Sequence, residues 1–538
     1  MLVPYTCCTK DFEDYYAGQT GRGLPYYQGG FAQKGYGIGG FFAKLFRSAM
    51  PFLVRGAKAV GKEALRTGSM VASDVLAGQN FKTALESRAL ESGKVLARKA
   101  VQKADQMIGR GKLKRKRSKR HRFISYKGRK TVIERGQWVE FHPLANVSDG
   151  SPVEFHISGS GDDYLDLSQT QLYVKAKITK ADGTPLGDND TKIGPVNLFL
   201  QSMFSQVDIS LNDRLISSSN NTYPYRAMIE TLLNHGIDAK SSQLSSELFF
   251  KDTAGRMNVY DPADTNPNHG FNQRAKLFKK SASVDMIGRL HLDMFHQDRL
   301  LLNLVDVKLK LIRSKPEFCL MGDGEFKVVL EHASLFVRKV RVSPGVVLGH
   351  AKALEKTTAK YPIERVVCKT YSVPTGNMSF VQDNIFIGQM PKRLVVAFMD
   401  TDAFNGNYKK SPFDFKHYNI NFMSVYVDGQ PMPSTPLQPD FENKHFIRAF
   451  QNLFVNAEDR GLHLSRSEFA EGNALFRFEL SPDLCDSAHL NLIRHSNLRL
   501  EVKFSEALNQ TISILVYAEF ENLIEINKAR NILFDFGN

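Results

Sequence analysis

The sequence has few cysteines, a single tryptophan and no long apolar run. The five cysteines (Cys7, Cys8, Cys319, Cys368 and Cys485) are scattered over 538 residues, a pattern typical of reduced, intracellular thiols rather than of a disulfide framework. No apolar stretch approaches the roughly 20 residues that span a bilayer. The first residues lack the basic head and apolar segment of a secretory signal. We therefore expect neither a transmembrane helix nor a secretory leader.

Common enzyme motifs are also missing. The sequence has no Walker loop, no HExxH, no GxSxG and no CxxC pair. Cys485 and His489 lie four residues apart, but no third group can be placed to orient them, so we interpret them as structural. We therefore predict no catalytic residue, no enzyme activity and no cofactor.

Metal sites are not indicated either. Asp162–Asp163 and Asp188/Asp190 are acidic clusters that could bind Ca²⁺, but solvated turns are the favoured interpretation. The 14 histidines show no spacing typical of metal ligands. Trp138, in GQWVEFHPL, is expected to anchor a strand rather than to stack on a base.

The positive charge is concentrated in the first quarter of the chain. Residues 1–130 contain 27 Lys and Arg against 8 Asp and Glu, whereas residues 131–538 contain 44 against 48. The net charge of +15 therefore divides into +19 and −4. A cationic arm ahead of a near-neutral body is typical of a protein that binds a polyanion with its tail.

Three segments make up this arm. Residues 1–40 are rich in Gly and Tyr and predict a disordered tail. Residues 41–109 have the pattern of a basic amphipathic helical segment, which could pack on a partner helix, bind nucleic acid or lie on a membrane. The candidate membrane-active residues are Phe41, Phe42, Leu45 and Phe46.

Residues 110–130 form a polybasic linker, in which 12 of 21 residues are Lys or Arg and none is acidic. Such a run cannot form a core, because its charges repel one another and it has little to bury. It suits phosphate backbones, where binding releases counterions, and it would also serve as a nuclear localisation signal. The candidate DNA-binding residues are Lys112, Lys114, Arg115, Lys116, Arg117, Lys119, Arg120 and Arg122.

From residue 131 onward the pattern is that of strands. Short runs rich in Val, Ile, Leu, Phe and Tyr alternate with polar residues and are separated by Asn, Asp, Gly and Pro. Four blocks occur twice in the same order, which indicates a duplicated β-domain with a boundary near Gly322–Glu325. The matched blocks are LSQTQLYVKAKI (167–178) with LEHASLFVRKVRV (330–342), QVDISLNDR (206–214) with MSVYVDGQP (423–431), YRAMIETLL (225–233) with FIRAFQNLF (446–454), and GRLHLDMF plus NLVDVKLKL (288–295, 303–311) with FRFELSPDL plus HSNLRLEVKF (476–484, 495–504).

The length of each copy and its long connections fit a jelly roll better than a small immunoglobulin-like sandwich. We predict a mainly β protein with two tandem eight-stranded antiparallel jelly-roll sandwiches, a double jelly roll, behind the disordered or helical basic region. The first jelly roll is expected at 131–323 and the second at 324–538.

The body resembles the double jelly-roll, hexon-like capsid proteins of the adomavirus, adintovirus and Polinton-like lineage. The resemblance is carried by NNTYPYRAMIETLLNHG (220–236), IGRLHLDMFHQDRLLLNLVDVKLKL (287–311), KTTAKYPIERV (356–366), FNGNYKKSPFDFKHYNINFMSVYVDGQPMPSTPLQPDF (404–441) and VYAEFENLIEINKARNI (516–532). Residues 20–125 resemble an adenovirus-type basic core segment.

This resemblance implies a late structural protein of the virion, assembled in the host nucleus. The chain would form homotrimers and a capsid lattice, meet a penton-like vertex protein and hold packaged double-stranded DNA with its arm. The alternative is a minor virion protein that condenses DNA or disrupts membranes, carried on a β-sandwich. The resemblance also implies an adenovirus-type cysteine protease that cuts between Arg110 and Gly111 in Met107-Ile-Gly-Arg-Gly111, whereas the match at Leu320-Met-Gly-Asp-Gly324 is interpreted as coincidental.

Overall fold

The computed structural model describes residues 133–147, 150–159, 161–217, 219–455, 462–482 and 494–536. The predicted tail (1–40), helical segment (41–109) and polybasic linker (110–130) all lie outside these residues, so they stay predictions. The chain divides into two compact units, and every described residue belongs to the unit that contains Thr131–Asn538.

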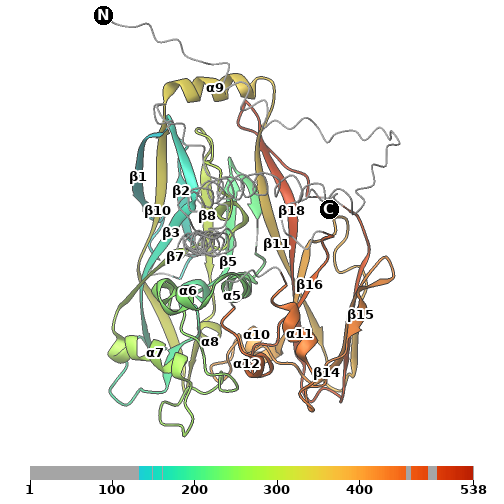
Figure 1. Cartoon of the computed structure of the whole chain (residues 1–538). Helices are drawn as coiled ribbons and strands as arrows, with labels where there is room; N and C mark the ends of the chain where they lie inside the picture. The colour runs from blue at the N-terminus through green and yellow to red at the C-terminus, as the bar shows by residue number, and fades with distance from the viewer. Residues whose placement is uncertain are drawn as a thin grey trace, which may run out of the picture. The chain divides into compact units, whose positions relative to one another are not determined.

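The first sandwich consists of two four-stranded sheets, with strand orders β1-β10-β3-β7 and β2-β8-β5-β6 (Figure 1). Its strands are β1 (Ile133–Phe141), β2 (Val153–Ile157), β3 (Asp163–Lys180), β5 (Phe204–Leu211), β6 (Arg214–Ser217), β7 (Val284–Arg289), β8 (Val307–Arg313) and β10 (Phe326–Val342). The connections contain β4 (Ile193–Pro195), α4 (Phe199–Ser202), α5 (Tyr223–Asn234), α6 (Ile237–Ser241), η2 (Gln243–Glu247), α7 (His269–Leu277), η3 (Lys279–Ser281), η4 (Asp293–Phe295), α8 (Pro316–Cys319) and β9 (Leu320–Gly322).

The second sandwich begins after α9 (Pro344–Leu354) and has sheets in the orders β11-β18-β13-β16 and β12-β17-β14-β15. Its strands are β11 (Ala359–Val373), β12 (Ser379–Gln382), β13 (Arg393–Asp400), β14 (Ile420–Val427), β15 (Gln430–Leu437), β16 (Phe476–Glu479), β17 (Leu498–Phe504) and β18 (Ile512–Ile526). Its connections contain α10 (Thr401–Asn405), α11 (Ile447–Asn452) and α12 (Arg466–Ala470), and β19 (Ile532–Leu533) pairs with β18.

The two sandwiches share one topology. When the eight strands of each sandwich are numbered along the chain, both have one sheet in the order 1-8-3-6 and another in the order 2-7-4-5. All pairings within these sheets are antiparallel. The predicted double jelly roll is therefore confirmed, and so is the duplication behind it.

Three of the four predicted repeat matches fall on equivalent strands and helices, but the match of 167–178 with 330–342 is wrong. These segments lie in β3 and β10, which pair with each other inside one sheet. The equivalents of β3 and β10 in the second sandwich are β13 and β18. Two long, alternating strands have the same local pattern whether they are equivalent or adjacent, which explains the mismatch.

The boundary between the sandwiches also differs from the prediction. β10 pairs with β1 and β3, so the first sandwich extends to Val342 rather than ending at 323. The glycine-rich turn near 322–325 connects β9 to β10 within this sandwich. In the second protease-like match, Leu320 and Met321 are buried in β9, whereas Asp323 and Gly324 are exposed in the turn that follows.

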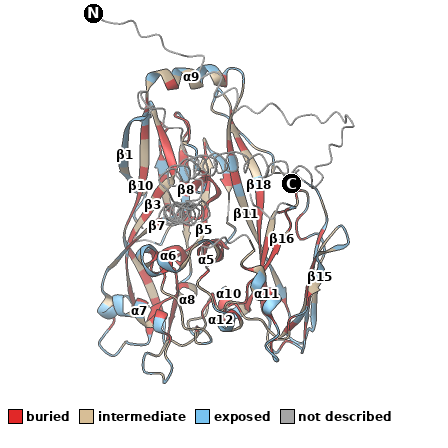
Figure 2. Ribbon diagram, in the orientation of Figure 1, coloured by how far each residue is buried: buried red, intermediate tan, exposed pale blue. Residues whose placement is uncertain are grey.

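Strand burial shows where the core sits. β8 and β17 alternate between buried and exposed residues, as strands with one wet face do (Figure 2). In contrast, residues 512–520 of β18 and 394–400 of β13 are buried on both faces. Their sheet is therefore covered on both sides, and its continuous apolar runs reflect this.

The hairpins between β5 and β6 and between β14 and β15 are tight turns. Asn212 and Asp213 both have positive φ (45° and 63°), and Asp428 and Gly429 do as well (49° and 81°). Two left-handed residues in a row give the turn whose twist matches that of antiparallel strands, and Asn, Asp and Gly tolerate it best. Both turns use the Asn, Asp and Gly residues that separate the strand-like runs in the sequence. Among the described residues, no helix is long and apolar enough to cross a membrane.

Candidate functional site

The residues predicted to act on DNA, protease or membrane cannot be placed, because they lie outside the described residues. These are Lys112, Lys114, Arg115, Lys116, Arg117, Lys119, Arg120 and Arg122, the cleavage residues Arg110 and Gly111, and Phe41, Phe42, Leu45 and Phe46. Cys485 and His489 also lie in an undescribed stretch.

The acidic clusters weighed as Ca²⁺ sites are engaged with cations. Arg341 Nε lies 2.9 Å from Asp163 Oδ1, Lys280 Nζ lies 2.7 Å from Asp188 Oδ1, and Lys180 Nζ lies 3.1 Å from Asp190 Oδ2. These carboxylates are paired along the chain's surface rather than gathered around one point, as a Ca²⁺ ion requires.

The two described cysteines are free thiols. Burial raises the pKa of both Cys319 and Cys368 to about 12, which leaves them protonated and poorly nucleophilic at neutral pH.

A buried polar network lies where the two sandwiches meet, and α5 carries its centre. Arg226 and Glu230 stand four residues apart on this helix, and Arg226 Nε donates to Glu230 Oε1 at 2.8 Å. Arg226 Nη1 lies 2.8 Å from Asp293 Oδ1, at the start of η4. All three side chains are at most 5% exposed. The guanidinium therefore joins two carboxylates away from water.

The network continues into the second sandwich. The Tyr517 hydroxyl on β18 lies 3.4 Å from Glu230 Oε1 and 2.9 Å from Glu519 Oε1. The backbone N–H of Val366 in β11 donates to Asp293 Oδ1 at 3.2 Å. Because the donors and acceptors come from both sandwiches, a shift of one sandwich against the other would break several buried hydrogen bonds at once.

A second set of ion pairs anchors the far end of this network within the second sandwich. Arg393 Nη1 lies 2.9 Å from Glu519 Oε2, and Arg393 Nε lies 2.6 Å from Glu479 Oε1. Arg477 Nε also donates to Glu479 Oε1 at 2.6 Å. The contacts from α5 to β16 thus alternate arginines and carboxylates except at Tyr517, whose hydroxyl joins Glu230 to Glu519.

The pKa shifts follow from this arrangement. Burial by itself would raise the pKa of the Glu230 carboxyl, but Arg226 and the nearby histidines outweigh it and hold that pKa well below its usual range. Burial raises the pKa of Glu519 even though Arg393 opposes the change. Burial also raises the pKa of Tyr517 well above its usual value, so its hydroxyl stays a donor. The network is therefore charged at Glu230 and suited to holding two domains in one orientation.

The same junction encloses a cavity of about 40 Å³, large enough for about one water molecule. Lys240 lines it, and its Nζ donates to the carbonyl oxygens of Leu232 (2.9 Å) and Leu462 (2.7 Å). Burial lowers the pKa of Lys240 to about 7. The cavity is too small for a substrate.

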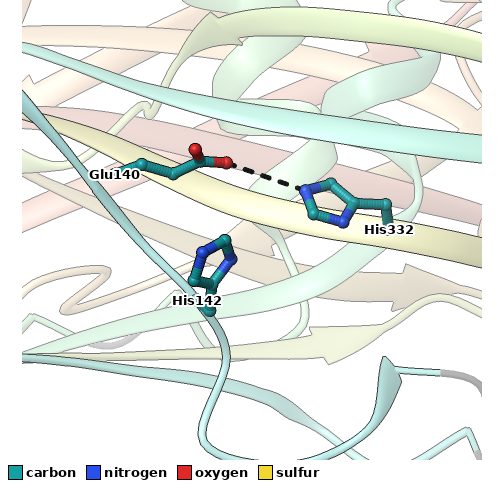
Figure 3. Close-up of side chains that lie close together, drawn as sticks. All are labelled: Glu140, His142 and His332. Atoms are coloured by element: carbon teal, nitrogen blue, oxygen red, sulfur yellow. Dashed lines mark ion pairs between the residues drawn. The ribbon is translucent and has the colours of Figure 1, made fainter.

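Two groups of histidine and carboxylate come together, although no sequence spacing pointed to them. Glu230, His291 and His296 form the buried group beside Arg226, and Glu140, His142 and His332 form an exposed group (Figure 3). In the buried group Glu230 already pairs with the Arg226 guanidinium, so a metal ion there would face a fixed positive charge.

The exposed group lies on the outer face of the sheet that contains β1 and β10. His332 Nε2 lies 3.8 Å from Glu140 Oε1, and the rings of His142 and His332 are 6.1 Å apart, edge to face. No arginine pairs with Glu140 among the described contacts. This group, unlike the buried one, has the donor set and the open surroundings for a metal ion.

Sequence reasoning missed both groups and the network. One signal was present for the network: Arg226 and Glu230 stand at i and i+4 on a helix whose neighbours are almost all apolar. Trp138 does lie in a strand as predicted, but its side chain is 51% exposed rather than buried.

The comparisons with known proteins point to one fold. No protein-family model matches the chain. A protein of Caenorhabditis elegans, described only as uncharacterized, is 25% identical over 431 residues, which cover 76% of this chain and 99% of that protein. A chain in the cryo-EM structure of the Sputnik virophage matches with a TM-score of 0.56 and 13% identity, over 78% of this chain and 92% of that one. At this identity the likeness shows the fold. The Faustovirus major capsid protein aligns with a TM-score of 0.48 and 8% identity, over 87% of this chain and 98% of that one.

Proposed function

We propose that this chain is a structural protein of a viral capsid and that its two sandwiches serve as paired building blocks of the shell. One observation carries the proposal: a single eight-strand topology occurs twice in one polypeptide. The fold shared with a chain of the Sputnik virophage particle supports it. The resemblance to adomavirus, adintovirus and Polinton-like capsid proteins points in the same direction.

The duplicated fold suits a homotrimer. Three chains bring six similar sandwiches into one ring, which then fills a six-fold position in a shell. The buried network at the junction supports this role, because it holds the two sandwiches of each chain in one orientation. A rigid pair of sandwiches presents its outer faces at a fixed angle, as a closed ring requires.

The outer faces offer surfaces for such contacts. β1 is an edge strand of the first sandwich, and its Ile133 and Trp138 are 42% and 51% exposed. β12 is an edge strand of the second sandwich. Its Val381 is 45% exposed, and Met378, which directly precedes the strand, is 54% exposed. Exposed edge strands with apolar side chains invite pairing with another chain. We place the contact between chains at these two edges, head to tail.

The cationic arm supports a second element of the proposal, binding of double-stranded DNA inside the particle. Twelve basic residues within 110–130 and none that is acidic suit the phosphate backbone in any sequence. The resemblance leads us to propose four further properties. These are nuclear localisation through the same run, cleavage between Arg110 and Gly111 by a cysteine protease, transient membrane contact through Phe41–Phe46, and contact with a penton-like vertex protein.

The test is the mass of the full chain in solution by mass photometry, at near-physiological salt. We expect a species of three times the chain mass of 60.6 kDa. Trp138→Asp in β1 should shift the population to monomers, because a buried unpaired carboxylate would oppose the contact. Leu348→Asp on α9, where Leu348 is 70% exposed, is the matched control and should leave the trimer intact.

A wild-type chain that stays a monomer at all concentrations would contradict the proposal. If such a monomer still compacted DNA, the chain would instead be a minor DNA-condensing virion protein.

A further inference from the structure

We propose that Glu140, His142 and His332 form a binding site for a divalent transition-metal ion, and that Zn²⁺ is the ion that suits it best. Two imidazoles and one carboxylate are a donor set that proteins use to hold Zn²⁺ while leaving a fourth position open. All three residues belong to one chain, so the site does not need the proposed capsid role, although Glu140 lies in β1, one of the two edges at which we propose the contact between chains.

Strand pairing brings the three residues together. Glu140 lies in β1, opposite Phe336 of β10 in the strand register, and His142 follows two residues later. Residues two apart in an extended chain point to the same face, so Glu140 and His142 share the outer face of the sheet. His332 projects from β10 onto that face, and Figure 3 shows the three side chains converging.

The distances between the ligand atoms are close to those found around a bound metal ion. One ligand atom from each side chain lies within 4.8 Å of those from the other two, and His332 Nε2 lies 3.8 Å from Glu140 Oε1. Two ligands of a tetrahedral ion at about 2.0–2.1 Å are about 3.4 Å apart. Small rotations of exposed side chains would therefore bring all three onto one ion. Glu140 and His332 are 41% and 42% exposed, so their side chains have room to make that change.

A surface ion pair alone does not account for the arrangement. The Glu140–His332 pair needs no second imidazole, and His142 stands edge-on to His332 with ring centroids 6.1 Å apart. A metal ion would bind both imidazoles at once, which a pairing of Glu140 with His332 alone does not do.

The surroundings favour a cation and hold one ligand in place. Tyr173 of β3 packs edge-on against the His332 ring, with centroids 5.8 Å apart, which limits the ring's orientation. Asp285 of β7, opposite Lys175 of β3 in the register, adds a carboxylate to this face. Lys175 lies opposite His332 on one side and opposite Asp285 on the other, so its positive charge has a carboxylate beside it on the same face. The buried Glu230–His291–His296 group lacks this property, because Arg226 already supplies its cation.

The test uses the full-length chain without any affinity tag, stripped with a chelator and dialysed. Co²⁺ is titrated as a spectroscopic probe, and Zn²⁺ affinity is measured by competition with a chromogenic chelator. We expect visible absorption typical of tetrahedral Co²⁺, which saturates at one ion per chain and is abolished by added Zn²⁺.

Three variants and a control locate the ion. His142→Ala and His332→Ala should each abolish the absorption. Glu140→Gln should weaken Zn²⁺ binding by at least about tenfold, since even the loss of a group that only hydrogen-bonds to a ligand costs that much. His269→Ala, which removes another exposed histidine at the start of α7, should bind as the wild type does. Circular dichroism checks that each variant is folded. No Co²⁺ absorption in the wild type, or unchanged binding in both histidine variants, would overturn the proposal.

Discussion

Removing the charge of Arg226 should destabilise the chain far more than removing a surface charge. Arg226→Met keeps most of the apolar stem but leaves Glu230 and Asp293 buried without their shared cation. Breaking a buried ion pair in this way costs about 3–5 kcal/mol, because an uncompensated charge stays in a low-dielectric interior. By contrast, the pair of Lys308 and Asp213 is 50% and 79% exposed, and such pairs contribute about 0–1 kcal/mol.

The assay is the urea midpoint of unfolding, followed by circular dichroism for the wild type, Arg226→Met and Lys308→Ala. We expect the midpoint of Arg226→Met to fall several times further than that of Lys308→Ala. A triple variant that also carries Glu230→Gln and Asp293→Asn should recover much of the loss, because neutral amides remove the unpaired charges. Equal midpoints for Arg226→Met and Lys308→Ala would refute the reasoning.

Three further predictions concern a buried lysine, the single tryptophan and the cationic arm. Lys240→Met should stabilise the chain near neutral pH. Burial lowers the pKa of Lys240 to about 7 in the folded chain, whereas the pKa stays near 10.5 in the unfolded chain. Between these two pH values the unfolded chain binds more protons, so the stability of the wild type rises with pH. The melting-temperature advantage of Lys240→Met should therefore shrink from about pH 7 to about pH 10, and a constant difference would contradict this. Trp138, the only tryptophan, is exposed in β1, so its fluorescence should shift to shorter wavelength as the chain assembles; an unchanged spectrum in the assembled state would place the contact elsewhere. Replacing the four basic residues within 112–116 by glutamine should make the slope of log DNA affinity against log salt concentration shallower by about 3.6, which is about 0.9 for each lost phosphate contact. An unchanged slope would exclude this run from the DNA contact.

Much of the fold could be predicted from sequence because strands, turns and duplication leave local patterns. The alternation in 498–504 and the Asp428-Gly429 turn predicted β17 and the hairpin after β14, and both are present. The partner of a strand leaves no such pattern. The segments 167–178 and 330–342 looked like repeats of each other, yet they are neighbours in one sheet, so the predicted domain boundary also came too early.

The candidate sites could not be predicted because their members are far apart in the chain. Glu140 and His142 meet His332 only because β1 and β10 pair, and no local spacing encodes that pairing. Arg226 likewise gains its second carboxylate from Asp293, beyond several intervening helices. Long-range strand pairing creates the first site and packing of a helix against a distant turn creates the second, whereas sequence periodicity reports only on single elements.

The central claim is that two matching sandwiches per chain build a ring with near six-fold appearance. Electron microscopy of the assembled full-length chain tests it most directly. We predict class averages in which six lobes of similar size form three pairs around a three-fold axis. Averages with two or four lobes, or single two-lobed particles under all assembly conditions, would contradict the account.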